Sequence, residues 1–470
     1  MSFSNKNNIL LVSVLFILIG IFLRTYQLNF DDYWLDEMIS FWVADPNISL
    51  VDTFARRDYI EQSPVLFDLF LKKYLHFFSY DPEIARYLPL FFGVLSIPLM
   101  GVLSYQVSKN NSFLLSIFLI SINIYLISYS QETRPYSLVF LLSTINLIFY
   151  YKIISSNITF FKKIIFFILF IAFSVLAFSS HPFTLILLFS QILNSVYFFL
   201  LFKKKDYLFF FSIPVILLAY LFFNFDYIVS QLSYSEFFLS HENWKFYYNY
   251  YFSRFFGSRI MGLIYLSTLI YLIILFRKKI FLTLNNYLLL IFVFLFSYII
   301  PLTYSYIKTP ILTDRYIIFV LIPILILISS LIFEVKNKKL KTFLFIFILA
   351  PTIINNYMEI KNRIITKPEF TKFLNNIKKS ETKSLAVHAP SRELMLVENY
   401  IKTLKEFKKM NFKIHNIDNI PNGEKMIWIT CYEPLVGFDC TLPNNKENEW
   451  NLMSVNKNYL LNSRLFKINN

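Results

Sequence analysis

Eleven apolar segments, separated by short polar stretches, constrain the fold of this chain more than any other feature. A membrane-spanning helix needs about 20 mostly apolar residues. The candidate segments are 9–24, 85–107, 112–130, 136–152, 163–180, 183–202, 207–224, 259–276, 282–302, 312–333 and 341–357. Only 16% of the residues are charged, whereas soluble domains carry about 25%. We therefore expect a mainly α, polytopic membrane protein with about eleven transmembrane helices.

The segment 64–79 decides how these spans are oriented. It is short for a span and places Asp68, Lys72, Lys73 and His76 on one helical stripe, which predicts an amphipathic helix at the membrane interface. If it does not span and the N-terminus is inside, the lysine-rich connections lie inside, as the positive-inside rule requires. These connections are 1–8, 108–111, 153–162, 203–206, 277–281 and 334–340. The net charge of +15 then reflects topology and not nucleic-acid binding.

The first outer connection, 24–84, collects acids. Eleven of the 30 carboxylates lie between Asp31 and Glu83, and a membrane protein that gathers scarce acids beside its first span is expected to build a site there. Asp36 stands out because it precedes an apolar run, although an Asp in such a position can instead cap a helix. Glu61 stands out because a proline opens the next apolar segment three residues later. A surface ion pair with a nearby arginine is the alternative for Glu61.

Three further outer motifs contain residues suited to binding a phosphate or a sugar. They are Arg134-Pro135-Tyr136, Ser180-His181-Pro182 and Asp314-Arg315-Tyr316, with Lys308 in the connection before the last. Topology disfavours arginines on the outer side, and a guanidinium grips phosphate with two donors. Snorkelling to lipid headgroups is the alternative for both arginines, and a structural turn packed under the first outer connection is a further alternative for Arg134. His181 can equally be a satisfied polar residue at a helix end, and Lys308 a solvated lysine.

The tail after residue 357 changes composition and becomes polar. Strand-like runs at Ser384–His388 and Met426–Cys431 and a helical pattern at Glu393–Leu404 predict a small extracytoplasmic α/β domain. Cys431 and Cys440 lie nine residues apart, and a disulfide between them is one possibility if the tail faces an oxidising compartment. The sequence leaves open whether they form it or remain free thiols.

The order of the outer motifs resembles that of the GT-C glycosyltransferases. Asp36-Glu37 follows the first span, an acid precedes the proline that opens the amphipathic helix, and the three outer motifs follow. The protein mannosyltransferase and aminoarabinose transferase group (glycosyltransferase family 39 and 83-like) is the most similar. The resemblance covers residues 9–330. It implies a GT-C transmembrane domain at 1–357, followed by the extracytoplasmic domain at 358–470.

For function, the resemblance implies inverting transfer of a sugar from a polyprenyl-phosphate-linked donor to an extracytoplasmic lipid, polysaccharide or protein. Asp36 matches the first-loop catalytic Asp, which acts as general base on the acceptor hydroxyl. Glu61 and Glu37 are the further candidate catalytic acids. The candidate substrate-binding residues are Arg134, Tyr136, His181, Lys308 and Arg315.

The metal requirement stays open at this point. Asp36 and Glu61 can instead share a divalent ion such as Mg²⁺ or Mn²⁺, since carboxylate oxygens are the ligands these ions prefer. The expected partners are the lipid-linked donor, the acceptor and membrane lipids, with no nucleic acid. The sequence names neither the sugar nor the acceptor nor the length of the lipid.

Two other classes compete with this interpretation. A transporter or flippase for polyprenyl-linked glycans places ionisable residues near the bilayer midplane, whereas here the charges line the outer face. An O-antigen polymerase or ligase carries its key arginines in a large mid-to-late outer loop, whereas here the acids gather in the first. We expect the protein in a bacterial cytoplasmic membrane, with its site on the extracytoplasmic face, because the chain is compact for a eukaryotic relative.

Overall fold

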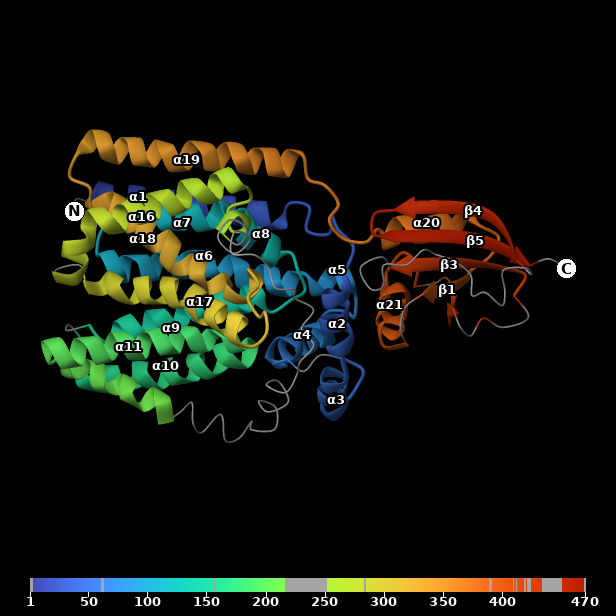
Figure 1. The fold of residues 1–470 in the computed structure, drawn as a ribbon, viewed down its shortest axis with the longest axis horizontal. Helices are drawn as coiled ribbons and strands as arrows, with labels where there is room; N and C mark the ends of the chain where they lie inside the picture. The colour runs from blue at the N-terminus through green and yellow to red at the C-terminus, as the bar shows by residue number, and fades with distance from the viewer. Residues whose placement is uncertain are drawn as a thin grey trace.

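A long helical bundle and a smaller sheet domain at one end of it make up the molecule (Figure 1). The structure is a computed structural model. It describes residues 3–60, 63–155, 158–215, 252–282, 285–388, 391–408, 410, 412–417, 420, 424–432 and 450–468.

Nine helical stretches of the described residues are long and apolar enough to cross a membrane. They contain α1 (Phe3–Thr25), α6 (Tyr87–Ser108), α9 (Tyr136–Ile153), α10 (Phe160–Ser180), α11 (Leu185–Phe202), α16 (Arg259–Leu282), α17 (Leu288–Ile307), α18 (Leu321–Glu334) and α19 (Lys338–Lys361). The pair α7 (Ser112–Ile122) and α8 (Ile124–Ser130), bent by 56°, makes a tenth if it is one span. The expectation of a polytopic helical protein is confirmed. The remaining predicted span, 207–224, lies partly outside the described residues and starts in the short helix η2 (Lys205–Ser212).

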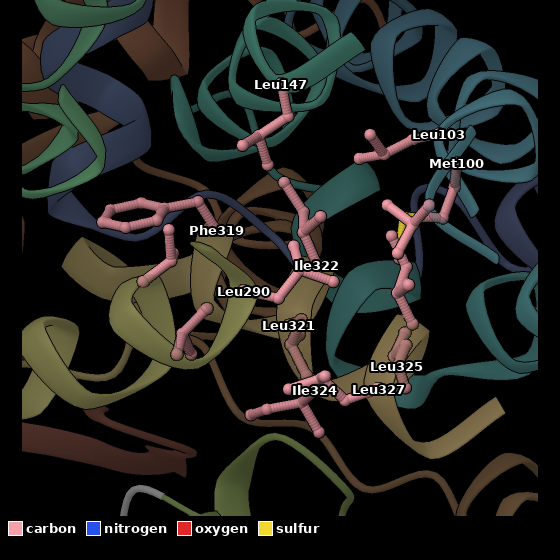
Figure 2. Close-up of a cluster of buried hydrophobic side chains, with 14 of the residues drawn as sticks. Met100, Leu103, Leu147, Leu290, Phe319, Leu321, Ile322, Ile324, Leu325 and Leu327 are labelled. Carbon is pink, nitrogen blue, oxygen red and sulfur yellow. The ribbon is translucent and has the colours of Figure 1, made fainter. Parts of the chain in front are cut away.

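The helix α18 lies at the centre of the bundle. With the short helix η5 (Arg315–Val320) it forms the most buried of the membrane-length stretches. Figure 2 shows side chains of α6, α9 and α17, among them Leu103, Leu147 and Leu290, around Ile322 and Leu325. Hydroxyl groups also join the helices, since Ser104 hydrogen-bonds Ser116 of α7 and Ser116 hydrogen-bonds Ser329 of α18. Small hydroxyl residues let helices approach closely where no water is available.

The bend between α7 and α8 is stabilised by polar side chains. Asn123 lies at the break, and its Oδ1 accepts a hydrogen bond from the Leu126 N–H at 2.9 Å, which caps α8. The buried Arg24, at the end of α1, donates to the carbonyls of Ile120 and Ser121 at 2.9 and 3.0 Å. These carbonyls lose helical partners at the break, and Arg24 replaces them.

Four short helices form the connection between α1 and α6. They are α2 (Leu35–Val43), α3 (Leu50–Ile60), α4 (Leu66–Phe77) and α5 (Pro82–Ala85). At 12 residues, α4 is too short to span a membrane. Its polar stripe, however, partly faces protein. Asp68 is fully buried 3.3 Å from Arg57 of α3, and the Lys72 ammonium donates to the Ile48 carbonyl at 2.7 Å.

The C-terminal domain contains a five-stranded sheet in the order β2-β1-β3-β5-β4. The strands are β1 (Ser384–His388), β2 (Lys413–Asn416), β3 (Met426–Tyr432), β4 (Trp450–Asn458) and β5 (Leu461–Ile468). The pairs β1–β2 and β1–β3 are parallel, and β3–β5 and β5–β4 are antiparallel. The helices of the domain are α20 (Phe370–Lys379) and α21 (Ser391–Thr403). The expected α/β character of the tail is confirmed. Cys431 in β3 is disulfide-bonded, and Cys440 lies outside the described residues.

Two acids of the first connection attach this domain to the bundle. Asp31 accepts a hydrogen bond from the Thr366 N–H at 3.1 Å, and Asp32 accepts from the Thr371 N–H at 2.7 Å. The Tyr33 and Tyr400 rings stack beside them, with centroids 5.2 Å apart. Burial raises the pKa of Asp32, although these hydrogen bonds oppose the rise. Part of the acidic cluster in the sequence therefore serves domain attachment, which the sequence pattern did not reveal.

Candidate functional site

Asp36 and Arg315 form the ion pair around which the candidate site is built. Arg315 Nη1 lies 2.7 Å from Asp36 Oδ2. The side chains are 24% and 20% exposed, respectively, so the pair is accessible from outside without being fully solvated. Asp36 lies in the first turn of α2, and Arg315 begins the stretch that leads into α18. The structure thus brings together an acid and an arginine that the sequence singled out separately.

The N-cap alternative for Asp36 is wrong. The helix α2 begins at Leu35 after the extended Trp34, so Asp36 is the second helical residue, and Trp34 at the cap makes no side-chain cap hydrogen bond. A negative charge in the first turn is favoured by the helix dipole. The carboxylate nevertheless points to Arg315 and not to the backbone of its own helix.

Three aromatic rings surround the Arg315 guanidinium. Its central carbon lies 5.1 Å from the Trp34 ring centroid, 5.9 Å from that of Tyr136 and 5.8 Å from that of Tyr316. Ring faces attract a guanidinium electrostatically, more strongly where water is excluded. The rings and Asp36 fix the position of the cation, and the hydrogen bond to Asp36 uses only one of its five N–H donors.

Arg134 also contacts Asp36 and holds the first turn of α2. Its Nη1 donates to the Asp36 carbonyl at 3.1 Å and to Ser40 Oγ at 3.2 Å, while Nη2 lies 3.9 Å from Asp36 Oδ2. The side chain is only 5% exposed. Arg134 therefore contacts Asp36 mainly through the backbone, from a buried position.

Tyr136 and His181 extend the site away from Asp36. The His181 ring lies 4.7 Å from the Tyr316 ring and 6.2 Å from that of Tyr136, between centroids. His181 Nδ1 also accepts a hydrogen bond from the Phe183 N–H at 3.3 Å, which caps η1 (Pro182–Thr184). The structure confirms that His181 is a satisfied polar residue at a helix end, and its ring lies beside the aromatic rings of the site. Binding of a sugar or phosphate by His181 stays a prediction.

Glu37 turns away from this site into a buried ion cluster. Arg86 approaches both of its oxygens at 3.3 Å, Lys367 donates to Oε2 at 2.7 Å, and the Thr133 N–H donates to Oε1 at 3.0 Å. Burial would raise the pKa of Glu37, but Arg86 and Lys367 outweigh it and hold the pKa below its usual range. Since the side chain is fully buried and both oxygens are engaged, the structure corrects the expectation that Glu37 is a catalytic acid.

Glu132 is a further acid at the site that the sequence reasoning did not select. Its Oε1 lies 3.1 Å from Lys367 Nζ, and its buried Oε2 has no hydrogen-bond partner among the described residues. Burial raises the pKa of Glu132 in spite of Lys367 and the more distant Arg315. An acid two residues before Arg134, in a short outer turn between two apolar spans, was the available signal.

Two candidates remain, Glu61 and Lys308. Glu61 lies outside the described residues. Lys308 is exposed at the end of α17, and no contact between it and Asp36 or Arg315 is found within the described part of the chain. Its role in substrate binding stays a prediction.

Two cavities lie beside the site and not at it. One, of about 460 Å³, opens between the ends of α1, α8 and α19, and one of about 530 Å³ lies between the first connection and the C-terminal domain. Both reach Asp31 and Arg86, and neither is lined by Asp36 or Arg315.

No protein-family model and no curated protein sequence matches the chain. Solved structures do. The structure is similar to ArnT, an aminoarabinose transferase from Cupriavidus metallidurans, bound to undecaprenyl phosphate, with a TM-score of 0.59 at 12% identity over 96% of this chain and 97% of that one. Both proteins share one fold from end to end. The fold is the GT-C fold.

A second GT-C structure supports the same assignment. The oligosaccharyltransferase of Archaeoglobus fulgidus, tethered to an acceptor peptide, is similar with a TM-score of 0.51 at 11% identity over 88% of this chain. The chain spans 64% of the length of that enzyme. The same oligosaccharyltransferase in complex with zinc and sulfate gives a TM-score of 0.50 at 12% identity, over 89% of this chain and 67% of that one. The resemblance of the sequence to GT-C proteins is confirmed at the level of the fold.

At Asp36, the divalent-metal site that the sequence suggested lies next to two arginines. Asp36 Oδ2 faces Arg315 at 2.7 Å and Arg134 at 3.9 Å, and two guanidinium groups repel a further cation at that oxygen. No group of three or more potential ligands is found in the described part of the chain. Glu61, the expected second ligand, lies outside it.

Proposed function

We propose that the chain is a membrane glycosyltransferase that moves a sugar from a polyprenyl-phosphate-linked donor to an extracytoplasmic acceptor, with inversion. The observation that carries the proposal is the accessible pair of Asp36 and Arg315, 2.7 Å apart. Such a transfer needs a base for the acceptor hydroxyl and a cation for the leaving phosphate, and this pair holds one of each. Undecaprenyl phosphate, bound by the similar ArnT, is the lipid carrier of the proposed class.

In the proposed reaction, an Asp36 oxygen accepts the proton of the acceptor hydroxyl. The acceptor oxygen attacks the anomeric carbon from the face opposite the phosphate, which inverts the configuration. As the new bond forms, the bond between the anomeric carbon and the phosphate oxygen breaks, and its electron pair stays on that oxygen. The phosphate gains negative charge, and Arg315 stabilises this charge with its remaining N–H donors.

The other residues have supporting roles in the proposal. Arg134 holds the backbone of Asp36 in place. Tyr136 and Tyr316 keep Arg315 from moving to the headgroups, and His181 packs on Tyr316 within reach of the sugar or phosphate. Glu61 remains a proposed second acid and Lys308 a proposed second phosphate cation. Glu37 has a structural role.

The proposal also includes the membrane in which the protein lies and the side of that membrane on which the site lies. The site lies at one end of the bundle. It is carried or adjoined by the end of α1, the start of α9, the end of α10 and the start of η5. The lysine-rich connections fall at the opposite end of the spans. Under the positive-inside rule, the site and the attached C-terminal domain face the extracytoplasmic side of a bacterial cytoplasmic membrane.

The experiment that tests the function is mass spectrometry of surface glycans from cells that lack the gene. We expect one glycan, glycolipid or glycoprotein to lose a single sugar, and the wild-type gene to restore it. A gene carrying Asp36→Asn should be expressed in the membrane without restoring the sugar. Unchanged glycans in the deletion strain, or full restoration by the variant, would overturn the proposal.

A further inference from the structure

We propose that Lys367 is a positioning residue that fixes the first turn of α2, with Asp36, against the turn that carries Arg134. This inference rests on the proposed function. Lys367 lies in the connection from α19 to α20, which leads out of the bundle into the C-terminal domain. Its side chain is only 12% exposed, because the ammonium reaches back into the bundle.

The ammonium contacts two buried carboxylates from distant parts of the chain. It lies 2.7 Å from Glu37 Oε2 and 3.1 Å from Glu132 Oε1. Glu37 directly follows Asp36, and Glu132 precedes Arg134 by two residues. One lysine therefore ties the two segments that carry the proposed base and the arginine that holds it.

The charges of the cluster make Glu132 depend on Lys367. Glu37 has a second cation, because Arg86 binds both of its oxygens. Among the described residues Glu132 makes its ion pair with Lys367 alone. Without the ammonium, a buried carboxylate at Glu132 would face the Glu37 carboxylate, and like charges at low dielectric repel strongly.

The same two segments are joined by weaker contacts that this repulsion would strain. The Thr133 N–H donates to Glu37 Oε1 at 3.0 Å, and Arg134 Nη1 donates to the Asp36 carbonyl at 3.1 Å. If the turn moves away from α2, Asp36 moves with respect to Arg134 and to the substrate. A misplacement of about 1 Å at a catalytic group can cost roughly 100-fold in rate.

The position of Lys367 also couples the C-terminal domain to the site. Thr366, the preceding residue, donates its N–H to Asp31, and Arg363 pairs with the same acid at 3.5 Å. The connection that attaches the domain is thus the one that places the ammonium between the carboxylates. Attachment of the domain therefore helps to hold the site in its geometry.

The test is a double-mutant cycle of Lys367→Met and Glu132→Gln in washed membranes, with the product defined by the deletion strain as readout. Lys367→Met should lower turnover by about tenfold or more, while undecaprenyl phosphate binds the purified protein with unchanged affinity. Glu132→Gln added to Lys367→Met should restore most of the turnover, because it removes the unpaired carboxylate. Lys367→Arg should retain activity. Lys372→Met is the matched control, because this exposed lysine of α20 pairs only with Glu369 among the residues that the structure describes.

A pH profile separates positioning from general stability. In Lys367→Met, the charged groups that face Glu132 are Glu37 and the more distant Arg315. The loss of turnover in Lys367→Met relative to wild type should become smaller as the pH falls, since Glu132 then takes up a proton and no longer repels the Glu37 carboxylate. If Lys367→Met does not accumulate in the membrane, the turnover of the double variant is compared with that of Glu132→Gln alone. The two turnover rates should be equal.

Wild-type turnover in Lys367→Met, no restoration by Glu132→Gln, or a deficit independent of pH would each overturn the inference. Asp36→Asn separates failure of the proposed function from failure of the positioning role of Lys367. An active Asp36→Asn rejects the proposed function itself. An inactive Asp36→Asn beside an unimpaired Lys367→Met rejects only the positioning role.

Discussion

Arg315 Nη1 lies 2.7 Å from Asp36 Oδ2 although 279 residues separate the two in the sequence. The pair joins the first turn of α2 to the start of the stretch that leads into the most buried helix, α18. Asp36 thus sits on a short helix of the first connection and is paired with an arginine at the start of the central stretch of the bundle. A reactive group held by a rigid element keeps its geometry, which transfer chemistry requires.

Asp36→Asn should abolish sugar transfer and leave folding intact. Loss of a general base typically costs about 10²–10⁴ in rate, and Asn has nearly the same shape as Asp. Because Asp36 does not cap α2, the substitution removes no helix-capping hydrogen bond. The measurement is product formation in membranes that contain equal amounts of wild type and variant. Transfer at the wild-type rate would take Asp36 out of the mechanism.

Asp32→Asn should change how the stability of the domain attachment depends on pH. Burial raises the pKa of Asp32 in the folded chain above the usual 3.8. Between pH 3.8 and that raised pKa, Asp32 keeps its proton in the folded chain but has released it in the unfolded chain. Rising pH across that interval therefore destabilises wild type through Asp32. The Tm of wild type minus that of Asp32→Asn should fall as the pH rises above about 3.8 and then level off. A difference that grows with pH would contradict the assignment.

A reporter that is active only outside the cytoplasm, fused after Asn470, should be active. The C-terminal domain is attached to the first connection through Asp31 and Asp32, so both lie at the same end of the bundle as Asp36. Under the positive-inside rule, we expect the lysine-rich connections at the opposite end to lie in the cytoplasm. A fusion after Lys205, in one of these connections, is the control and should be inactive. The reverse pattern would invert the topology and place the site inside.

The helices and the outer motifs could be predicted from the sequence because their signals are local. Apolar runs of sufficient length define spans without reference to partners, and ten predicted spans correspond to the nine membrane-length helices and the bent pair of the described residues. The charge clusters could not be predicted in this way. Lys367 and Glu37 are 330 residues apart, and only the folded chain shows that this acid has a lysine and an arginine while its neighbour Asp36 faces the site.

The last prediction concerns Arg315 and the phosphate. Arg315→Lys should weaken the binding of undecaprenyl phosphate to the purified protein, because lysine keeps the charge but lacks the planar fork that holds two phosphate oxygens. Loss of one hydrogen bond to a charged group corresponds to about 1.5–3 kcal/mol, or roughly 10- to 100-fold in affinity. An arginine that merely snorkelled to the headgroups would tolerate lysine.

Arg56→Lys provides the matched control. Arg56 lies 3.5 Å from Asp45 and over the Trp42 ring at 4.4 Å, so it has the same kinds of partner in the same connection, away from Asp36. Its replacement should leave the affinity for undecaprenyl phosphate unchanged. The phosphate role of Arg315 fails if Arg315→Lys binds the lipid as wild type does. It also fails if Arg56→Lys and Arg315→Lys weaken binding equally, since the loss would then reflect the general charge of the outer face and not the guanidinium beside Asp36.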